Sequence, residues 1–247
     1  MTVAPHPEWI CPDWPAPAGV RALITTRAGG VSNGAYASLN LGLRVGDDPD
    51  SVKRNRAIVR AFLPAEPVWM KQVHGVRVIE AERASSDAEA DAAVTRQPGC
   101  VCAVLTADCL PVLLCDRSGG AIGIAHAGWR GLAAGVIENT VRSMSAPEGG
   151  LIAYLGPGIG APVYEVGEEV RDVFVRPDPA AGAAFMPGAP GKFFADLYEL
   201  ARHRLGAAGV GEVHGGGFCT LSDARFFSFR RDRTTGRMAS MIWLEEN

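Results

Sequence analysis

The sequence lacks most of the local patterns by which metal enzymes are recognised. Histidine is scarce, with five residues among 247, at positions 6, 74, 126, 203 and 214. No H-x-H pair, no C-x-x-C and no H-E-x-x-H occurs. A multicopper oxidase needs many more histidines, arranged in H-x-H pairs, and the short spacings of zinc motifs are absent as well. A metal site would therefore have to be assembled from residues far apart in the chain.

Long apolar runs and a strong excess of one charge are also missing. The most apolar stretch, 100–115, is interrupted by Asp108 and Pro111, so it is not expected to span a membrane. Residues 1–9 carry proline, histidine and glutamate where an export signal needs a basic start and an apolar block. The net charge of −3 and the pI near 6.0 do not indicate nucleic acid or a membrane surface as partner. We expect a cytoplasmic protein.

Six cysteines occur in the chain, four of them between positions 100 and 115. A chain of this length without an export signal is not expected to be a disulfide scaffold. Cys100, Cys102 and Cys115 are expected to be small buried apolar residues in strands. Cys109 differs, because a charge and a proline interrupt its strand.

The remaining composition, 47% hydrophobic and 21% charged, is that of a globular protein. Five prolines and two tryptophans in the first twenty residues indicate an irregular arm over residues 1–19. We predict one α+β domain over residues 1–247. Apolar periodicity predicts strands at 20–26, 92–95, 101–105, 112–115, 121–125 and 151–155, helices at 50–62, 131–145, 167–174 and 193–205, and a final hairpin of 226–231 with 237–243.

Three side chains with metal-binding chemistry fall at ends or breaks of the predicted core strands: His74, Cys109 and His126. Rigid strands hold such side chains in place while the loops leave room for a substrate. Thiolate and imidazole suit zinc, and three protein ligands with an open fourth position are typical of a catalytic site. The alternative is a thiol satisfied within the core and two unrelated histidines.

Two arginines lie at glycine-rich turns. Arg130 precedes the helix predicted from residue 131, and Arg27 opens a glycine-rich loop. A guanidinium beside a helix N-terminus suits phosphate. In the alternative, Arg130 pairs with a surface carboxylate.

Taken in order, several strings along the chain form a familiar set. They are Arg27-Ala-Gly-Gly-Val-Ser, Ser38-Leu-Asn-Leu-Gly42, Lys71-Gln-Val-His-Gly75, Asp91-Ala-Ala-Val-Thr95, Thr106-Ala-Asp-Cys-Leu-Pro111, Ala125-His-Ala-Gly-Trp-Arg-Gly131 and the closing Phe227-Ser-Phe-Arg-Arg-Asp232. The sequence resembles the laccase-domain, or YfiH-like, family over nearly its whole length. The resemblance implies a layered α/β/β/α fold with mixed sheets, similar to the catalytic domain of cytotoxic necrotizing factor. It also implies that His74, Cys109 and His126 bind one zinc ion, with copper as the other candidate.

Members of that family are described as purine nucleoside phosphorylases that act on adenosine, inosine and methylthioadenosine, with an adenosine deaminase activity. Other labels are polyphenol oxidase and peptidoglycan editing factor. The resemblance therefore implies a zinc-dependent nucleoside enzyme whose partners are a small-molecule nucleoside and phosphate. In a non-enzymatic alternative, the metal ion is structural and the chain is a binding module.

Each label asks for different residues. Phosphorolysis needs an anion clamp beside a ribose pocket, for which Arg27, Arg130 and the polar Asn40 are candidates. Deamination needs an acid near a metal-activated water, for which Asp108 or Glu165 could serve. A cysteine amidase that edits peptidoglycan precursors would use Cys109 as nucleophile and His126 as base. A copper polyphenol oxidase is the weakest candidate, because histidine is so scarce.

Overall fold

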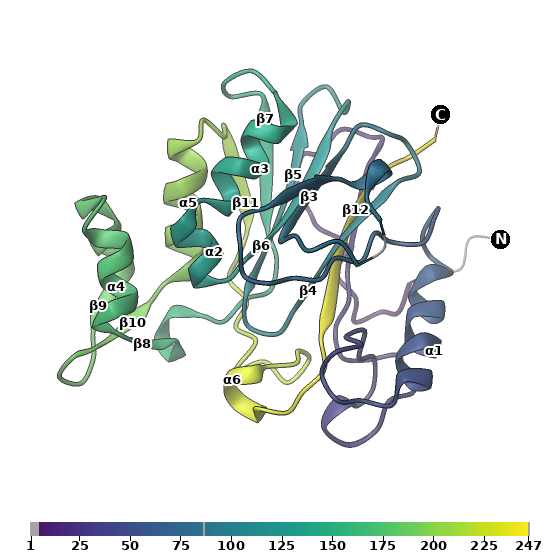
Figure 1. The fold of residues 1–247 in the computed structure, drawn as a ribbon, viewed down its shortest axis with the longest axis horizontal. Helices are drawn as coiled ribbons and strands as arrows, with labels where there is room; N and C mark the ends of the chain where they lie inside the picture. Colours follow the sequence, from purple (N-terminus) through teal and green to yellow (C-terminus); the bar gives the residue numbers. More distant parts are fainter. Residues whose placement is uncertain (1–4, 86, 247) are drawn as a thin grey trace.

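Two β-sheets packed face to face form the centre of the computed structural model, which describes residues 5–85 and 87–246 (Figure 1). The larger sheet has six strands in the order β11-β7-β5-β6-β3-β2, and the smaller has three in the order β1-β12-β4. The larger sheet is mixed, since β11–β7 and β2–β3 are parallel pairs and its other pairs are antiparallel. Their bounds are β1 Val20–Ile24, β2 Val78–Glu80, β3 Ala92–Thr95, β4 Val101–Thr106, β5 Leu110–Asp116, β6 Ile122–Ala127, β7 Leu151–Leu155, β11 Glu212–Gly215 and β12 Met238–Leu244.

Side-chain alternation along the strands explains why the sheets stack. In β4, Val104 points into the core between the two sheets, while Ala103 points to the opposite face. In β5, Leu113 faces the smaller sheet and Leu114 faces away from it. Strands with apolar residues on both faces must be covered on both sides, so each sheet needs a further layer outside it.

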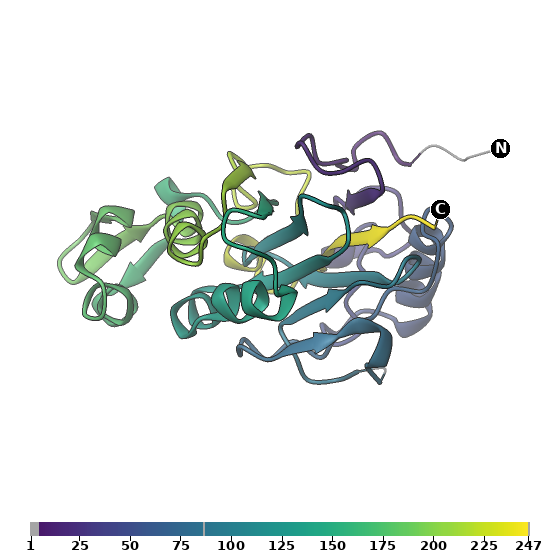
Figure 2. The same ribbon diagram turned by 90° about the horizontal axis from the view of Figure 1, so that it is seen from above.

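Helices supply those outer layers. Helix α1 (Pro49–Arg60) covers the smaller sheet through Val59, whereas α2 (Trp129–Ala134), α3 (Val136–Met144) and α5 (Leu197–Ala207) cover the larger one (Figure 2). Asp48 caps α1 by accepting a hydrogen bond from the Ser51 backbone, 2.9 Å. The predicted α/β/β/α layering is therefore confirmed.

A smaller unit extends from the side of the larger sheet (Figure 1). It consists of β8 (Glu165–Gly167), β9 (Phe185–Pro187) and β10 (Lys192–Ala195), in the order β8-β10-β9, with α4 (Glu168–Val175) beside them. The helix predicted at 193–205 is therefore wrong in its first residues, which form β10. The helix begins only after Asp196, which caps it by accepting hydrogen bonds from two backbone N–H groups.

Two further predictions need correction. The helix predicted at 131–145 is broken at Gly135, whose φ of 99° lies outside the helical range. The predicted hairpin of 226–231 with 237–243 is wrong, because Phe229–Asp232 forms the short helix α6, capped by Ser228. Strand β12 pairs instead with β1 and β4, which are distant in the sequence.

The described part of the predicted arm, residues 5–19, forms one isolated bridge, from Ile10 to Ile24, and residues 1–4 lie outside the described residues. Trp9 is buried and packs edge-on against Phe62. Of the helices in the described ranges, none is long and apolar enough to cross a membrane. The prediction for Cys102 and Cys115 is confirmed, because both are fully buried, and Cys100 is half-buried.

Candidate metal centre and its cavity

His74, Cys109 and His126 converge at one edge of the paired sheets. Cys109 lies between β4 and β5, His126 is near the end of the neighbouring β6, and His74 is in the loop before β2. Their ligand atoms all lie within 4.8 Å of one another, and Cys109 Sγ is 3.8 Å from His74 Nε2. The predicted convergence is confirmed: the group could hold a metal ion.

The donor set fits zinc in both chemistry and spacing. One thiolate and two imidazoles are ordinary zinc ligands. Zinc bonds at tetrahedral angles would place a sulfur and a nitrogen about 3.6 Å apart, close to the observed Sγ–Nε2 distance of 3.8 Å. Three protein ligands leave one coordination position for water or substrate.

Asp91, at the start of β3, holds both histidines in place. Its Oδ1 accepts a hydrogen bond from His126 Nδ1, 2.8 Å, so the other ring nitrogen of His126 is left to bind metal. The same carboxylate accepts hydrogen bonds from the backbone N–H groups of Val73, His74 and Gly75, at 3.1, 2.9 and 2.7 Å. These bonds stabilise the loop in which His74 has a φ of 60°.

Asp91 is a functional residue that the sequence pattern did not predict. The available signal was an aspartate directly before an apolar strand, which is an unusual start for a buried segment. Asp91 is fully buried, and burial raises its pKa. Hydrogen bonds from His126 and from the backbone N–H groups outweigh that effect, and the pKa lies below its ordinary value.

Cys109 and His126 form a strongly coupled pair. Burial raises the pKa of the Cys109 thiol, but the His126 and His74 imidazoles outweigh it and lower the pKa to about 6. Burial lowers the pKa of His126, while the Cys109 thiolate and Asp91 raise it to about 9. The electrostatics therefore favour a thiolate, which is the form of cysteine that binds metal or attacks a carbonyl.

Two further residues shape the centre. Gln72 exchanges two hydrogen bonds with the backbone of Leu105, both 2.8 Å, which fixes the loop of His74 to β4. Gly128 lies against the ligands, because a Cβ there would be 2.9 Å from Cys109 Sγ and 3.1 Å from His74 Cδ2. A larger residue at position 128 would displace both.

The centre opens into a cavity of about 380 Å³. A cavity of this volume is large enough for a small organic ligand. All three candidate metal ligands contribute to its wall. The other lining residues are Gly42, Leu43, Arg44, Val45, Arg56, Trp69, Met70, Gln72, Asp87, Leu105, Thr106, Ala107, Phe229 and Arg237.

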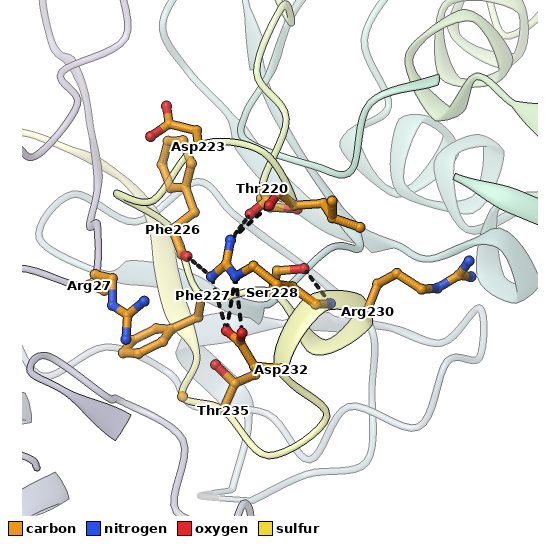
Figure 3. Close-up of polar contacts among 12 residues, drawn as sticks. Arg27, Thr220, Asp223, Phe226, Phe227, Ser228, Arg230, Asp232 and Thr235 are labelled. Atoms are coloured by element: carbon orange, nitrogen blue, oxygen red, sulfur yellow. Dashed lines mark hydrogen bonds and ion pairs between the residues drawn. The ribbon is translucent and has the colours of Figure 1, made fainter. Parts of the chain in front are cut away.

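The predicted substrate-binding residues lie outside the described lining of this cavity. Arg27 donates to the Ala37 carbonyl, 2.8 Å, and its guanidinium lies 4.9 Å from the centre of the Phe227 ring (Figure 3). Arg130 is exposed and stacks on its neighbour Trp129, 4.4 Å. Their predicted contact with phosphate stays a prediction.

Asn40 is fully buried, and its contacts are within the protein. Its Oδ1 accepts hydrogen bonds from the backbone N–H groups of Gly42 and Arg237, both 2.9 Å, and both of these residues line the cavity. Its amide nitrogen donates to Asp47, 2.9 Å. The predicted contact of Asn40 with substrate stays a prediction, and the structure adds a role in building the cavity wall.

Asp108 precedes Cys109 and has a φ of 89°. One carboxylate oxygen accepts from the Thr220 hydroxyl and the other from the Arg230 backbone N–H, both 2.6 Å. Arg231 holds the segment 220–232 together by donating hydrogen bonds to the carbonyls of Thr220 and Phe226 and to the carboxylate of Asp232. Asp108 thus ties the strand break at Cys109 to the C-terminal part of the chain, and its predicted role as an acid stays a prediction.

Comparison with known proteins finds relatives along almost the whole chain. The family model described as multi-copper polyphenol oxidoreductase laccase matches residues 21–245. A Pseudomonas aeruginosa protein named purine nucleoside phosphorylase is 56% identical over 240 residues, which cover 96% of this chain and 99% of that protein. The purine nucleoside phosphorylase YfiH of Escherichia coli is 51% identical over 239 residues, which cover 95% and 98%.

A solved structure agrees with this assignment. The crystal structure of a Neisseria meningitidis protein has a TM-score of 0.93 to this chain at 53% identity, and the match covers 96% of this chain and 99% of that one. The family match and the level of identity assign the family even if the His–Cys–His group is not considered. The chain therefore belongs to the multi-copper polyphenol oxidoreductase laccase family, with YfiH of Escherichia coli among its relatives.

Proposed function

We propose that the protein is a zinc-dependent purine nucleoside phosphorylase that acts on adenosine, inosine and methylthioadenosine. The observation that carries this proposal is the His–Cys–His group in the wall of a cavity that also carries three guanidinium groups. The names of the Pseudomonas and Escherichia relatives support it. In such a cavity an uncharged nucleoside and an anionic phosphate could bind next to each other.

His74, Cys109 and His126 would hold the ion, which when bound polarises a substrate oxygen or a water molecule. Other residues orient a candidate ligand and form the wall of the cavity. Asp91 keeps the Nδ1 proton on His126 and so fixes its orientation. Leu43, Val45, Leu105 and Phe229 give the cavity an apolar wall against which a purine can pack.

The proposal includes adenosine deaminase activity as a second reaction of the same centre. Deamination exchanges the amino group at purine C6 for the oxygen of water, and so needs a residue that carries protons. With Glu165 as the alternative, Asp108 stays the candidate for that task. Its two hydrogen-bond donors, Thr220 and Arg230, leave it next to the ligand Cys109.

The test is a nucleoside assay with the zinc-loaded protein. Inosine is expected to give hypoxanthine and ribose 1-phosphate when phosphate is present and to remain intact when it is absent. Adenosine is expected to give inosine without phosphate. The Cys109→Ala variant should lose both reactions and its zinc. Hypoxanthine release that does not depend on phosphate would contradict a phosphorylase.

A cysteine amidase that edits peptidoglycan precursors is the second candidate, and one observation favours it. Cys109, His126 and Asp91 have the order of nucleophile, base and orienting carboxylate, with His126 Nδ1 2.8 Å from Asp91. The two candidates respond to zinc in opposite ways. Zinc would block the thiolate that an amidase needs, whereas a zinc-dependent phosphorylase requires the ion. Peptide cleavage that appears on chelation, with nucleosides untouched, would favour the amidase.

Copper polyphenol oxidation has the least support. A multicopper oxidase needs several metal sites, and the described residues offer one group of three ligands. Copper as the bound ion, in place of zinc, is tested by metal analysis of the purified protein.

A further inference from the structure

The charge of the cavity wall is strongly unbalanced. Three arginines line it, Arg44, Arg56 and Arg237, and Asp87 is the single carboxylate among the described lining residues. Asp87 pairs with Arg44 at 3.1 Å, and both side chains are more than half exposed. Arg56 and Arg237 therefore have no carboxylate partner among the described residues, although both are half-buried.

Neutral groups hold the Arg56 guanidinium in place. Arg56 lies on α1, its Nε donates to the Leu41 carbonyl, 3.0 Å, and its guanidinium stacks on Trp69 at 4.2 Å. Burial lowers its pKa to about 10, so it remains a cation at neutral pH. These contacts orient the group without cancelling its charge.

Arg237, directly before β12, is held in the same way. Its Nη1 donates to the carbonyls of Thr235 and Gly236, 3.1 and 2.9 Å, and its backbone N–H donates to the buried Asn40, 2.9 Å. Burial lowers its pKa, and the negative charges of Cys109 and Asp108 oppose that effect. Arg237 lines the same cavity as the three candidate metal ligands.

Half-buried charges without a direct ion-pair partner are costly, because each guanidinium gives up hydration while the negative charges around it, Glu66 and Asp87 for Arg56 and Cys109 and Asp108 for Arg237, act on it without an ion pair. Such an arrangement is stable when neutral hydrogen bonds compensate in part, and it binds an anion well because the cations are already oriented. Two guanidinium groups suit the oxygens of a phosphoryl group. The adjoining apolar wall, with Leu43 and Phe229, would take the uncharged part of a substrate.

We propose that Arg56 and Arg237 form the subsite for a phosphoryl group in this cavity, with Arg44 at its rim. The inference rests on the proposed phosphorylase function, in which the ligand is inorganic phosphate. In that reaction a phosphate oxygen bonds to the anomeric carbon of the ribose as the bond from that carbon to the purine nitrogen breaks. The electron pair leaves with the purine, which takes the proton of hydrogen phosphate.

The first test is steady-state kinetics of inosine phosphorolysis with Arg56→Gln and Arg237→Gln. Loss of a charge-assisted contact should raise the KM for phosphate about 10- to 100-fold, while the KM for inosine should change far less. Arg56→Lys, which keeps the charge, should recover part of the loss. Arg54→Gln is the matched control, because Arg54 is exposed on the same helix and donates to Ser51. Unchanged KM for phosphate in both variants would overturn the subsite.

Calorimetric titration of the zinc-loaded protein separates the subsite from the reaction. Inorganic phosphate and inosine 5′-monophosphate are titrated separately into the wild-type protein and each variant, after thermal unfolding has shown that the variants fold. Weaker phosphate binding in both variants supports the subsite even where the wild-type protein turns over no nucleoside, in which case only the phosphorylase proposal fails. A loss confined to inosine 5′-monophosphate, with binding of inorganic phosphate unchanged, would contradict the subsite for inorganic phosphate. A loss in Arg27→Gln or Arg130→Gln instead would overturn the proposal.

Discussion

Asp91 contacts both histidines of the candidate metal centre. Its carboxylate orients the His126 ring and accepts three backbone hydrogen bonds from the loop of His74. We expect Asp91→Asn to weaken zinc binding about 10- to 100-fold, as loss of a carboxylate behind a metal-bound histidine does elsewhere. Competition with a zinc chelator measures the affinity.

A matched control separates orientation from charge. Asp50→Asn removes an exposed carboxylate that pairs with Lys53 at 3.0 Å and that belongs neither to the His–Cys–His group nor to the described cavity lining. It should leave zinc affinity unchanged. Equal zinc affinity in Asp91→Asn and the wild-type protein would contradict the role of Asp91.

The Cys109 thiol gives a prediction about pH. Since its pKa is lowered to about 6, the thiolate is present above that pH and is lost as the pH falls through it. In metal-free protein, the rate at which iodoacetamide alkylates Cys109 should rise with pH. The midpoint of this rise should lie near pH 6, and the rate should be close to its maximum at pH 7. The measurement is mass spectrometry of the peptide carrying Cys109, with Cys109→Ser as control. A midpoint above 8 would contradict the coupling with His126.

At the scale of the residue, the sequence could predict the three candidate metal ligands but not the groups that hold them in place. His74, Cys109 and His126 stand at strand ends, where reactive residues gather, and their residue types are rare in this chain. Arg56 lies inside a helix, and Asp91, although it directly precedes a strand, is one of 27 acidic residues, so neither stands out by residue type. Their roles depend on burial and on partners 15 to 35 residues away, which only the folded chain brings together.

Among the elements, α2 begins in direct contact with the candidate metal centre, which limits the size of the residue at its N-cap. Gly128 is its N-cap, with an ordinary φ of −67°, so alanine would not strain the backbone there. A Cβ would nevertheless be 2.9 Å from Cys109 Sγ. We expect Gly128→Ala to lower zinc affinity at least tenfold at a modest cost in stability, measured by chelator competition and thermal unfolding.

Gly206→Ala is the corresponding control within a helix. Gly206 lies in α5 with open space around its Cα, so alanine should stabilise the protein, by about 0.5–1 kcal/mol, through helix propensity. Its zinc affinity should not change. If Gly128→Ala bound zinc as tightly as Gly206→Ala, the close packing at position 128 would have no consequence for the ligands.

The elements predicted correctly are those with a clear apolar period, such as α1 and β4. The prediction of the final hairpin was wrong for a physical reason. Phe226 and Phe227 are fully buried and resemble part of a strand in sequence, but they belong to the apolar contact with Met238 beneath a short helix. The partners of β12 lie more than 120 residues away, and periodicity carries no information about such pairing.

At the scale of the molecule, the layers and the centre depend on each other. The α/β/β/α order could be expected from the family resemblance, whereas the apolar pattern alone predicted only a mixed α+β domain. The order of strands could not, because β1, β12 and β4 join the two ends of the chain with its middle. The three candidate ligands lie where β5, β6 and the loop before β2 meet, so an ion there would add a link between segments that strand pairing and the hydrogen bonds of Asp91 and Gln72 already join.

Zinc should therefore stabilise the whole fold. Zinc that binds the native state alone adds about 2.7 kcal/mol when free zinc is 100 times its Kd, and for a chain of this size this corresponds to about 5–10 °C in Tm. Calorimetric unfolding with and without a chelator measures the shift. Cys109→Ser should abolish it, because one of three ligands is lost, whereas the exposed Cys11→Ser should keep it. An equal zinc-dependent shift in both variants would place the stabilising ion elsewhere and remove the link between this centre and the fold.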